Sequence, residues 1–296
     1  MCPFGGRWVA GTAPVWTPAR MVCHCLLVET DQGLVLVDTG FGTADVAAPD
    51  RRLGSPFMAL SRPRFDPEAT ALRQIGRLGF GARDVRHIVL THLDLDHAGG
   101  LSDFPEASVH LHLFEHAVAT GAPSWRERGR YRPVQWAHGP RWVTYRAYGE
   151  RWFGFDCVRR LEGLPPEVLL IPLFGHSRGH SGVAVEAEPG KWLLHAGDAY
   201  FHHDEVHGEP LRCPPALDLF QSLVQVDGAA RRHNRDRLAE LARQHRGKIE
   251  VFSAHDALEL ERLARPVRVN DPRLWQARLA SRGNGAPARS GSHGHG

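Results

Sequence analysis

The chain has 296 residues, of which 42% are hydrophobic, and its 36 basic and 33 acidic residues leave a net charge of +3. This length allows one large domain with a substantial core. The small net charge argues against a nucleic acid as partner, and no stretch approaches the ~18 apolar residues that a membrane span requires. We therefore expect a globular protein that acts on a small molecule.

The first residues and the cysteines bear on the compartment. Residues 1–7 lack a basic segment followed by an apolar core, so we predict no signal peptide. The five cysteines are odd in number and irregularly spaced, which is typical of reduced thiols. Cys23 and Cys25 would share one face of an alternating strand, where a place in the core is favoured over a metal site. These features predict a cytoplasmic protein.

The first part of the chain reads as loop, hairpin, connection, helix and strand. Residues 1–21 are rich in Gly, Pro and Trp and predict a loop that forms one lip of a site. The elements predicted after it are a hairpin over 22–37, an irregular connection over 43–66, a helix over 67–78 and a buried strand over 85–90.

The segment 91–100 places two imidazoles and two carboxylates within six residues: His92, Asp94, Asp96 and His97. A strand would direct His97 away from the other three. A loop just beyond a strand end can instead wrap all four around a pair of ions, and the two glycines that follow let the chain turn close to such a site. The simpler alternative is a solvated acidic loop with two incidental histidines.

Two regions in the middle of the chain have uncertain roles. In the alternating strand 108–113, His110 and His112 lie opposite the leucines, and we predict that they face solvent. A short helix is predicted over 114–120. Residues 121–165 contain four of the eight tryptophans. They form either a satellite core or an aromatic wall over the metals, because loops of this length are often functional.

Three later strands are also followed by metal-type side chains. Strands over 168–171, 191–194 and 249–252 precede His176, Asp198 and His255. Ligands in layered α/β sheets gather beyond strand ends. With the segment 91–100, seven such side chains at four strand ends predict a metal centre.

The remaining residues carry weaker signals. His180 is predicted to support the site or to pack rather than to bind metal. The cluster 202–207 is predicted to form a pocket rim or a polar loop, and 229–244 an amphipathic helix. One catalytic domain over 1–272 is expected, followed by a disordered tail over 273–296.

These motifs resemble those of the metallo-β-lactamase-fold hydrolases. The segment 92–97 is similar to the family's His-x-His-x-Asp-His signature, with Asp94 where the second His usually stands. His176, Asp198 and His255 match the later ligand positions in order. The resemblance covers residues 22 to 260 and implies an α/β fold, an αββα sandwich of two packed mixed sheets flanked by helices.

The resemblance also implies two divalent metal ions and a mechanism. One ion would take His92, Asp94 and His176, the other Asp96, His97 and His255, and Asp198 would bridge them. A hydroxide between the ions would attack an ester-type carbonyl, and an Asp, Asp96 by position, or solvent would protonate the leaving group. Asp38, in the Asp-Thr-Gly turn, would orient a ligand.

Asp94 bears on the identity of the metals. Zinc is the first choice for this family. An extra carboxylate removes one positive charge from the centre and favours harder ions, so iron and manganese are the alternatives.

Within the family, the motif spacing is most similar to that of the N-acyl-homoserine-lactone lactonases, which implies a lactone substrate. Those enzymes place a catalytic Tyr three residues after the bridging Asp. Here Phe201 stands at that position, and Tyr200, one residue earlier, is the candidate. The alternatives are a thioesterase of the glyoxalase II kind, a di-iron redox protein and a ligand-binding protein on the same fold.

Overall fold

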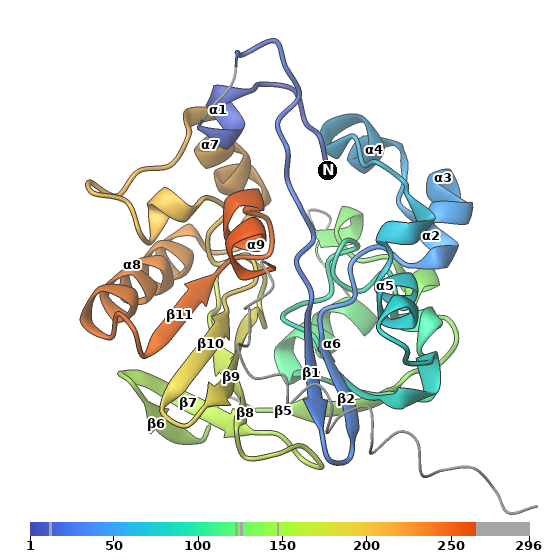
Figure 1. The fold of residues 1–296 in the computed structure, drawn as a ribbon. Helices are drawn as coiled ribbons and strands as arrows, with labels where there is room; N and C mark the ends of the chain where they lie inside the picture. Colours follow the sequence, from blue (N-terminus) through green and yellow to red (C-terminus); the bar gives the residue numbers. More distant parts are fainter. Residues whose placement is uncertain (12–13, 122–123, 125–126, 147, 265–296) are drawn as a thin grey trace, which may run out of the picture. The chain divides into compact units, whose positions relative to one another are not determined.

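The computed structural model describes residues 1–11, 14–121, 124, 127–146 and 148–264. Residues 1–260 form one compact unit that contains two β-sheets. The first sheet runs in the order β1 (Leu26–Thr30), β2 (Gly33–Val37), β3 (Val85–Val89), β4 (Ser108–His112) and β5 (Arg141–Tyr145). The second runs β11 (Ile249–Phe252), β10 (Lys191–His195), β9 (Ser181–Glu188), β8 (Val168–Pro172), β7 (Phe155–Arg160) and β6 (Glu150–Trp152) (Figure 1).

Both sheets are mixed. In the first, β2 to β5 are parallel and β1 joins β2 as an antiparallel hairpin. In the second, β10 and β11 are parallel and the other pairs are antiparallel. Parallel neighbours place their carboxyl ends at the same edge, which gathers the loops after β2 and β3, and likewise those after β10 and β11.

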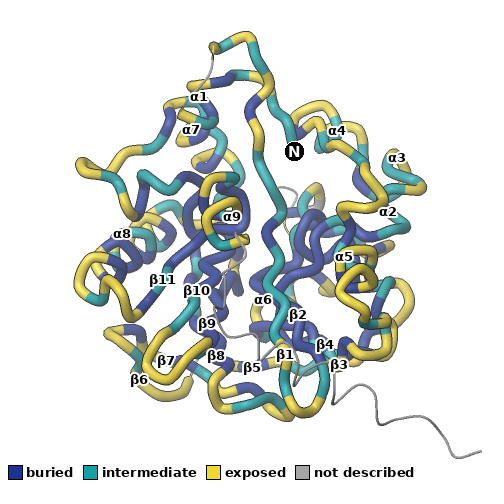
Figure 2. Tube along the Cα trace, viewed as in Figure 1, coloured by how far each residue is buried: buried dark blue, intermediate teal, exposed yellow. Residues whose placement is uncertain are grey.

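Alternation along the strands builds the layers. On β2, Val35 and Val37 pack with Val183 and Val185 of β9 in a core between the two sheets. Their neighbours in sequence point to the opposite face of the sheet, since successive side chains of a strand alternate. The inner strands β2, β4 and β8 are accordingly buried on both faces, as Figure 2 shows in dark blue, whereas the edge strands β1 and β6 contain no buried residue.

Helices cover both outer faces. On the first sheet, α5 (Ala71–Arg77) and α6 (Leu113–Thr120) contribute to the outer core that contains Leu34 and Leu36. On the second sheet, α8 (Gly228–Gln244) packs Leu238 and Leu241 against the outer face. The layers are therefore helix, sheet, sheet, helix, which confirms the predicted αββα sandwich.

Shorter elements complete the described chain. They are α1 (Arg7–Ala10), α2 (Thr43–Ala47), α3 (Pro49–Arg52), α4 (Ser55–Ser61), α7 (Pro215–Val224) and α9 (Ala257–Leu263), with the 3₁₀ turns η1 (Pro67–Ala69), η2 (Ala82–Asp84), η3 (Leu101–Asp103), η4 (Glu127–Gly129), η5 (Pro133–Gln135) and η6 (His203–Glu205). No helix in the described residues is long and apolar enough to cross a membrane.

Two expectations about connections were wrong. The segment 43–66 is not irregular but carries α2, α3 and α4, and prolines stand in the first turns of the last two, where proline is tolerated. These helices are too short for a periodic pattern to show. The helix predicted over 67–78 is split, because Thr70 is extended with ψ 148° and separates η1 from α5.

The expectation that His110 and His112 face solvent was also wrong. Both are buried, because β4 lies inside the sheet between β3 and β5. His110 Nε2 is 2.8 Å from His87 Nδ1, and its Nδ1 is 2.8 Å from the hydroxyl of Tyr145. An alternating pattern marks two faces of a strand but does not show whether the second is covered.

The aromatic residues of 121–165 pack into the cores. Tyr131 and Trp136 belong to the outer core of the first sheet, Tyr145 to the core between the sheets, and Trp152 packs against the outer core of the second sheet. Trp125 lies outside the described residues. These core aromatics therefore have the packing role of the first alternative, although they join the main cores and not a satellite core, and Tyr148 and Phe153 are exposed. The predicted tail over 273–296 and the boundary at 272 also lie outside the described residues.

Candidate functional site

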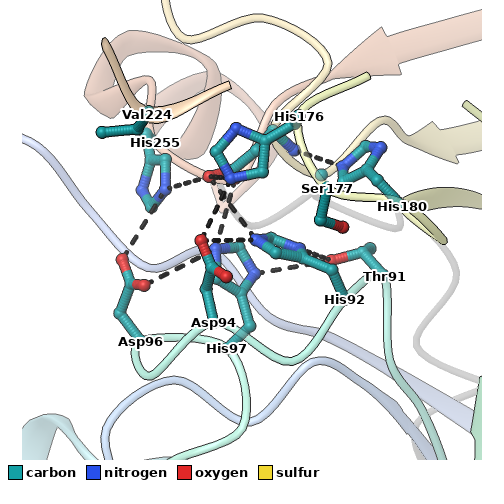
Figure 3. Close-up of polar contacts among 12 residues, drawn as sticks. Thr91, His92, Asp94, Asp96, His97, His176, Ser177, His180, Val224 and His255 are labelled. Carbon is teal, nitrogen blue, oxygen red and sulfur yellow. Dashed lines mark hydrogen bonds and ion pairs between the residues drawn. The ribbon is translucent and has the colours of Figure 1, made fainter. Parts of the chain in front are cut away.

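The seven metal-type side chains predicted from the sequence meet at one place. His92, Asp94, Asp96 and His97 lie in the loop after β3, and His176 lies in the loop after β8. Asp198 follows β10 and His255 follows β11. The cluster therefore forms where loops of both sheets meet, and Figure 3 shows its imidazoles converging.

Asp198 is at the centre of the cluster. Its Oδ1 is 3.2 Å from His97 Nε2, and its Oδ2 is 3.1 Å from His255 Nε2. The same Oδ2 is 3.4 Å from His176 Nε2 and 3.7 Å from His92 Nε2. Burial alone would raise the pKa of this carboxyl, but the surrounding histidines, His255 first, hold it well below its usual range.

The other two carboxylates lie on either side of Asp198. Asp94 Oδ2 is 3.1 Å from His176 Nε2 and 3.4 Å from His92 Nε2. Asp96 Oδ2 is 3.7 Å from His255 Nε2, and its Oδ1 is 4.0 Å from His97 Nε2. One carboxylate thus accompanies His92 and His176, and the other accompanies His97 and His255.

Three of the four histidines have their second nitrogen committed to an oxygen acceptor. His97 Nδ1 donates to Asp38 Oδ2 at 2.8 Å, and His255 Nδ1 donates to the carbonyl of Val22 at 2.8 Å. His92 Nδ1 donates to Thr91 Oγ1 at 2.9 Å, because that hydroxyl gives its own proton to Asp38. In this tautomer each Nε2 presents a lone pair to the cluster, which is the form that binds metal.

Asp38 and His180 support the cluster without belonging to it. Asp38 Oδ1 accepts from the amide of Thr91 at 2.8 Å, and its residue has a left-handed φ of 53°. Burial alone would raise the pKa of Asp38, but the contact with His97 outweighs burial and leaves that pKa below its usual value. His180 Nδ1 donates to the carbonyl of Leu173, and its Nε2 accepts from the amide of Asp198 at 2.8 Å. Both nitrogens of His180 are therefore in use, in agreement with the predicted supporting role.

Metal ions fit this donor set. Five buried atoms of these residues make no hydrogen bond with any described residue: Nε2 of His92, Nε2 of His97, Nδ1 of His176, Oδ1 of Asp94 and Oδ1 of Asp198. Buried polar atoms are almost always satisfied, so such a concentration needs an explanation. Ligand atoms of His92, Asp94, His176 and Asp198 lie within 4.8 Å of one another, as do those of His97, Asp198 and His255. Imidazole and carboxylate ligands in two adjoining groups could hold two ions.

Tyr200 is not brought to this cluster. It is fully buried in the outer core of the second sheet, and its hydroxyl donates to Glu259 Oε1 at 2.9 Å. Glu259 Oε2 in turn accepts from the amide of Ser253, so Tyr200 supports the turn that carries His255. The next residue, Phe201, reaches the cluster instead, with its ring 4.8 Å from that of His255.

A cavity of about 1150 Å³ opens over the cluster. The cluster residues at its floor are Asp94, Asp96, His176, Asp198 and His255. Its apolar lining comes mostly from three places, the N-terminal segment, α4 and α7. It includes Phe4, Val9, Met21, Phe57, Leu60, Leu217, Phe220 and Leu223, and Phe201 also contributes. The N-terminal segment thus forms a lip of the site, as predicted from the sequence, whereas no described aromatic residue of 121–165 lines the cavity.

The cluster over 202–207 has a different role from the predicted rim. None of its residues lines the cavity. His203 Nδ1 and the amide of His203 both donate to Asp256 Oδ2 at 2.8 Å. The His203–Asp256 contacts therefore hold the chain next to His255.

Three side chains near the cluster were missed by the sequence reasoning. Arg130 lies 3.0 Å from Asp94, and Cys23 Sγ lies within 4.8 Å of ligand atoms of Asp96 and His255. Glu115 of α6 accepts from the amide of Leu93 at 3.0 Å and from Ser177 Oγ at 2.6 Å, which ties the loop after β3 to the loop after β8. Of these residues, only Cys23 belongs to a recognisable motif, the Cys-His-Cys triplet. The sequence pattern did not show that this triplet lies before β1, beside the cluster.

Comparison with known proteins gives a consistent result. Residues 19–254 match the family model described as the metallo-beta-lactamase superfamily. A protein named probable metallo-hydrolase from Mycobacterium tuberculosis (strain ATCC 25618 / H37Rv) is 46% identical over 245 residues, which cover 83% of this chain and 77% of that protein. An N-acyl homoserine lactonase from Bacillus cereus is 25% identical over 205 residues, covering 66% of this chain and 68% of that one.

Solved structures show the same fold. A B. thuringiensis AiiA mutant with N-decanoyl-L-homoserine bound at the active site superposes with a TM-score of 0.64, covering 88% of this chain and 92% of that chain at 21% identity. AidC, described as a dizinc quorum-quenching lactonase, gives a TM-score of 0.56 at 18% identity, covering 86% of this chain and 84% of its own.

Proposed function

The chain belongs to the metallo-beta-lactamase superfamily and is a metallo-hydrolase by that relationship, and from this premise we propose that it uses two metal ions to hydrolyse an ester-type bond, with a lactone as the favoured substrate. The observation that carries the proposal is the set of three imidazoles whose Nδ1 protons are committed to oxygen acceptors while their Nε2 atoms face buried carboxylates.

Each ion has its own ligands in this proposal. His92, Asp94 and His176 would hold one, Asp96, His97 and His255 the other, and Asp198 would contribute to both. The position of Asp198 between the two groups supports the bridging role, because its two oxygens contact histidines of both. Zinc is the first choice, since imidazole-rich sites suit it and the similar AidC is described as dizinc.

Bound divalent ions would polarise a carbonyl and make water nucleophilic near neutral pH. The residues of the chain supply orientation and the proton. Asp38 and the carbonyl of Val22 hold His97 and His255 in the required tautomer. Asp96 lines the cavity and is the carboxyl that we assign to proton delivery to the leaving group. Tyr200 does not share that task, since its hydroxyl donates to Glu259 away from the cavity.

The cavity supports a substrate with an apolar chain. Its floor is polar, whereas Phe57, Leu60, Phe220 and Leu223 line the walls above it. Leu60 and Leu223 are exposed to solvent. Large apolar side chains that gather at one exposed surface usually mark a site for a ligand or partner. The N-decanoyl-L-homoserine and the product N-hexanoyl-L-homoserine bound in similar lactonase structures have such a chain.

The test is a substrate panel on protein reconstituted with zinc or manganese. The panel contains N-acyl homoserine lactones of increasing chain length, p-nitrophenyl esters, an acyl-glutathione thioester and bis-p-nitrophenyl phosphate. We expect lactone hydrolysis with kcat/KM rising with chain length, because each buried CH₂ contributes about 0.8 kcal/mol. Metal-stripped protein and Asp198→Asn serve as controls.

The outcomes separate the candidate functions. Preferred cleavage of the thioester would replace the lactone proposal with a thioesterase. The protein could instead bind two ions and reduce oxygen while hydrolysing no member of the panel. That result would replace the hydrolase proposal with di-iron redox chemistry.

A further inference from the structure

Asp94 is in contact with an arginine from a distant part of the chain. Arg130 Nη1 lies 3.0 Å from Asp94 Oδ2, the same oxygen that faces His92 and His176. The Arg130 side chain is only 7% exposed, and that of Asp94 is 16% exposed. Exposed ion pairs contribute little, but a pair shielded from water at a cavity wall interacts more strongly.

The guanidinium is held in place from its other side. Arg130 Nη2 donates to the carbonyl of Val224, the last residue of α7. One end of the fork is thus anchored on a helix, and the other is directed at Asp94. A planar guanidinium with two fixed contacts has little freedom to turn away.

The charges of the proposed centre show what this contact does. Two divalent ions carry four positive charges, and Asp94, Asp96 and Asp198 bring three negative ones, which leaves +1. A neutral histidine at position 94 would leave +2. Arg130, which is always protonated, adds one positive charge beside Asp94 and restores +2.

We propose that Arg130 is a positioning residue that acts with Asp94 as one neutral unit, so that the pair takes the electrostatic place of a histidine in the metal centre. Asp94 supplies the ligand oxygen, and Arg130 fixes its orientation and cancels its charge. This inference rests on the proposed metal centre and assigns a residue that the ligand motifs do not contain.

Binding of an anionic substrate group is a weaker account of Arg130. Its guanidinium is already paired with Asp94, and Arg178, the other arginine beside His176, is paired with Glu127 at 2.8 Å. An incoming carboxylate would have to displace a carboxylate of the protein. The third arginine that lines the cavity, Arg62, lies over the ring of Phe4, and the wall around it is mostly apolar.

The test is a double-mutant cycle read by metal binding. The zinc dissociation constant is measured by chelator competition for wild type, Arg130→Met, Asp94→His and the double variant. Metal binding is a readout independent of turnover. Circular dichroism of the metal-free proteins confirms that each variant is folded, and Asp94→Asn is run in parallel as a neutral variant of the same shape.

The sign of the Arg130→Met effect is expected to depend on residue 94. With Asp94 present, the substitution weakens zinc binding, because the carboxylate loses the 3.0 Å ion pair that orients it, and this loss outweighs the gain from removing a positive charge. With His at position 94, the same substitution tightens binding, because an uncompensated positive charge leaves the centre. The two fold-changes should differ by at least about tenfold, a coupling of roughly 1.4 kcal/mol.

Two further variants sharpen the interpretation. Arg130→Lys keeps the charge but not the fork that also reaches the carbonyl of Val224, so its zinc affinity should lie between those of wild type and Arg130→Met. Arg132→Met is the matched control, because Arg132 is a partly buried arginine of the same segment whose guanidinium donates to the carbonyls of Arg51 and Arg52. It should leave zinc affinity unchanged in both backgrounds.

The cycle has a result that overturns the proposal. If the Arg130→Met effects in the two backgrounds differ by less than about tenfold, Arg130 and Asp94 do not act as a unit. A Lys variant that behaves like the Met variant would equally refute charge compensation. A wild-type protein that binds no zinc would refute the proposed centre itself, which distinguishes that failure from the failure of this inference.

Discussion

Asp38→Asn is the substitution that tests the proposed centre most directly, because it reverses the two hydrogen bonds at one carboxylate oxygen without changing shape. Asp38 is buried with a left-handed φ of 53°, a conformation that Asn tolerates as well as Asp. Its carboxylate accepts from the amide of Thr91, from Thr91 Oγ1 and from His97 Nδ1. An asparagine oxygen can replace Oδ1, but its NH₂ group would then face His97 Nδ1.

Two donors cannot face each other, so His97 must move its proton to Nε2. The nitrogen that faces Asp198 at 3.2 Å would then carry a hydrogen and lose its lone pair. Loss of such a supporting partner typically costs 10–100-fold in metal affinity, roughly 1.4–2.7 kcal/mol. We expect the ion served by His97 to be weakened by this amount. The ion served by His92 should be weakened as well, because Thr91 Oγ1 loses the acceptor that sets the tautomer of His92.

The assay is elemental analysis of metal per chain after dialysis against a graded series of chelator concentrations. Asp45→Asn is the matched control, because Asp45 is equally buried but accepts from Gly42 and pairs with Arg52 at 2.5 Å. If Asp38→Asn binds both ions as tightly as wild type, or if Asp45→Asn loses as much metal, the tautomer argument is refuted.

Three other predictions concern the bridging ligand, acid stability and the aromatic segment. Asp198→Ala should lose both ions while His255→Ala loses mainly one; retention of one ion at full affinity in Asp198→Ala would contradict the bridging role. Burial lowers the pKa of His110 from 6.5 to about 3, so its contribution to stability is complete above pH 6.5 and is lost as the pH falls toward 3. In His110→Gln, the free energy of unfolding, measured with urea, should therefore fall by about 2 kcal/mol less between pH 7 and pH 5 than in wild type. The same pH dependence in both proteins would show that His110 is already protonated in the folded state. Trp136→Ala should lower the free energy of unfolding by about 3–5 kcal/mol with KM unchanged, and the reverse pattern would assign Trp136 to the substrate wall.

The gathering of the seven metal-type side chains could be predicted because each is marked locally in the sequence. A buried strand followed by His or Asp is visible within ten residues, as at β3 and His92 or at β10 and Asp198. The parallel pairing of β2 with β3 and of β10 with β11 then brings those strand ends together. The orienting role of Asp38 was inferred from the family resemblance, and its hydrogen bond with His97 agrees with that inference.

The helical part of the cavity wall could not be predicted from the sequence in this way. The helices α4 and α7 are short, and their cavity residues, such as Leu60 and Leu223, are exposed to solvent. Apolar residues at such positions are indistinguishable in sequence from scattered surface residues. Tyr200 was misleading for a related reason. Neighbouring residues of a chain point in different directions, so Phe201 lines the cavity and Tyr200 lies in the core.

The charge of the centre shows most clearly what the sequence could not supply. The ligand motif reveals Asp94 as a departure, and the departure alone suggests a less electrophilic centre with a preference for iron or manganese. Arg130 changes that argument, since its guanidinium lies 3.0 Å from the extra carboxylate and offsets its charge. No local pattern links the two residues, because the contact depends on how the segment before β5 crosses the loop after β3. A changed ligand in a metal motif therefore predicts a changed metal only after the charges within a few ångströms of it have been counted.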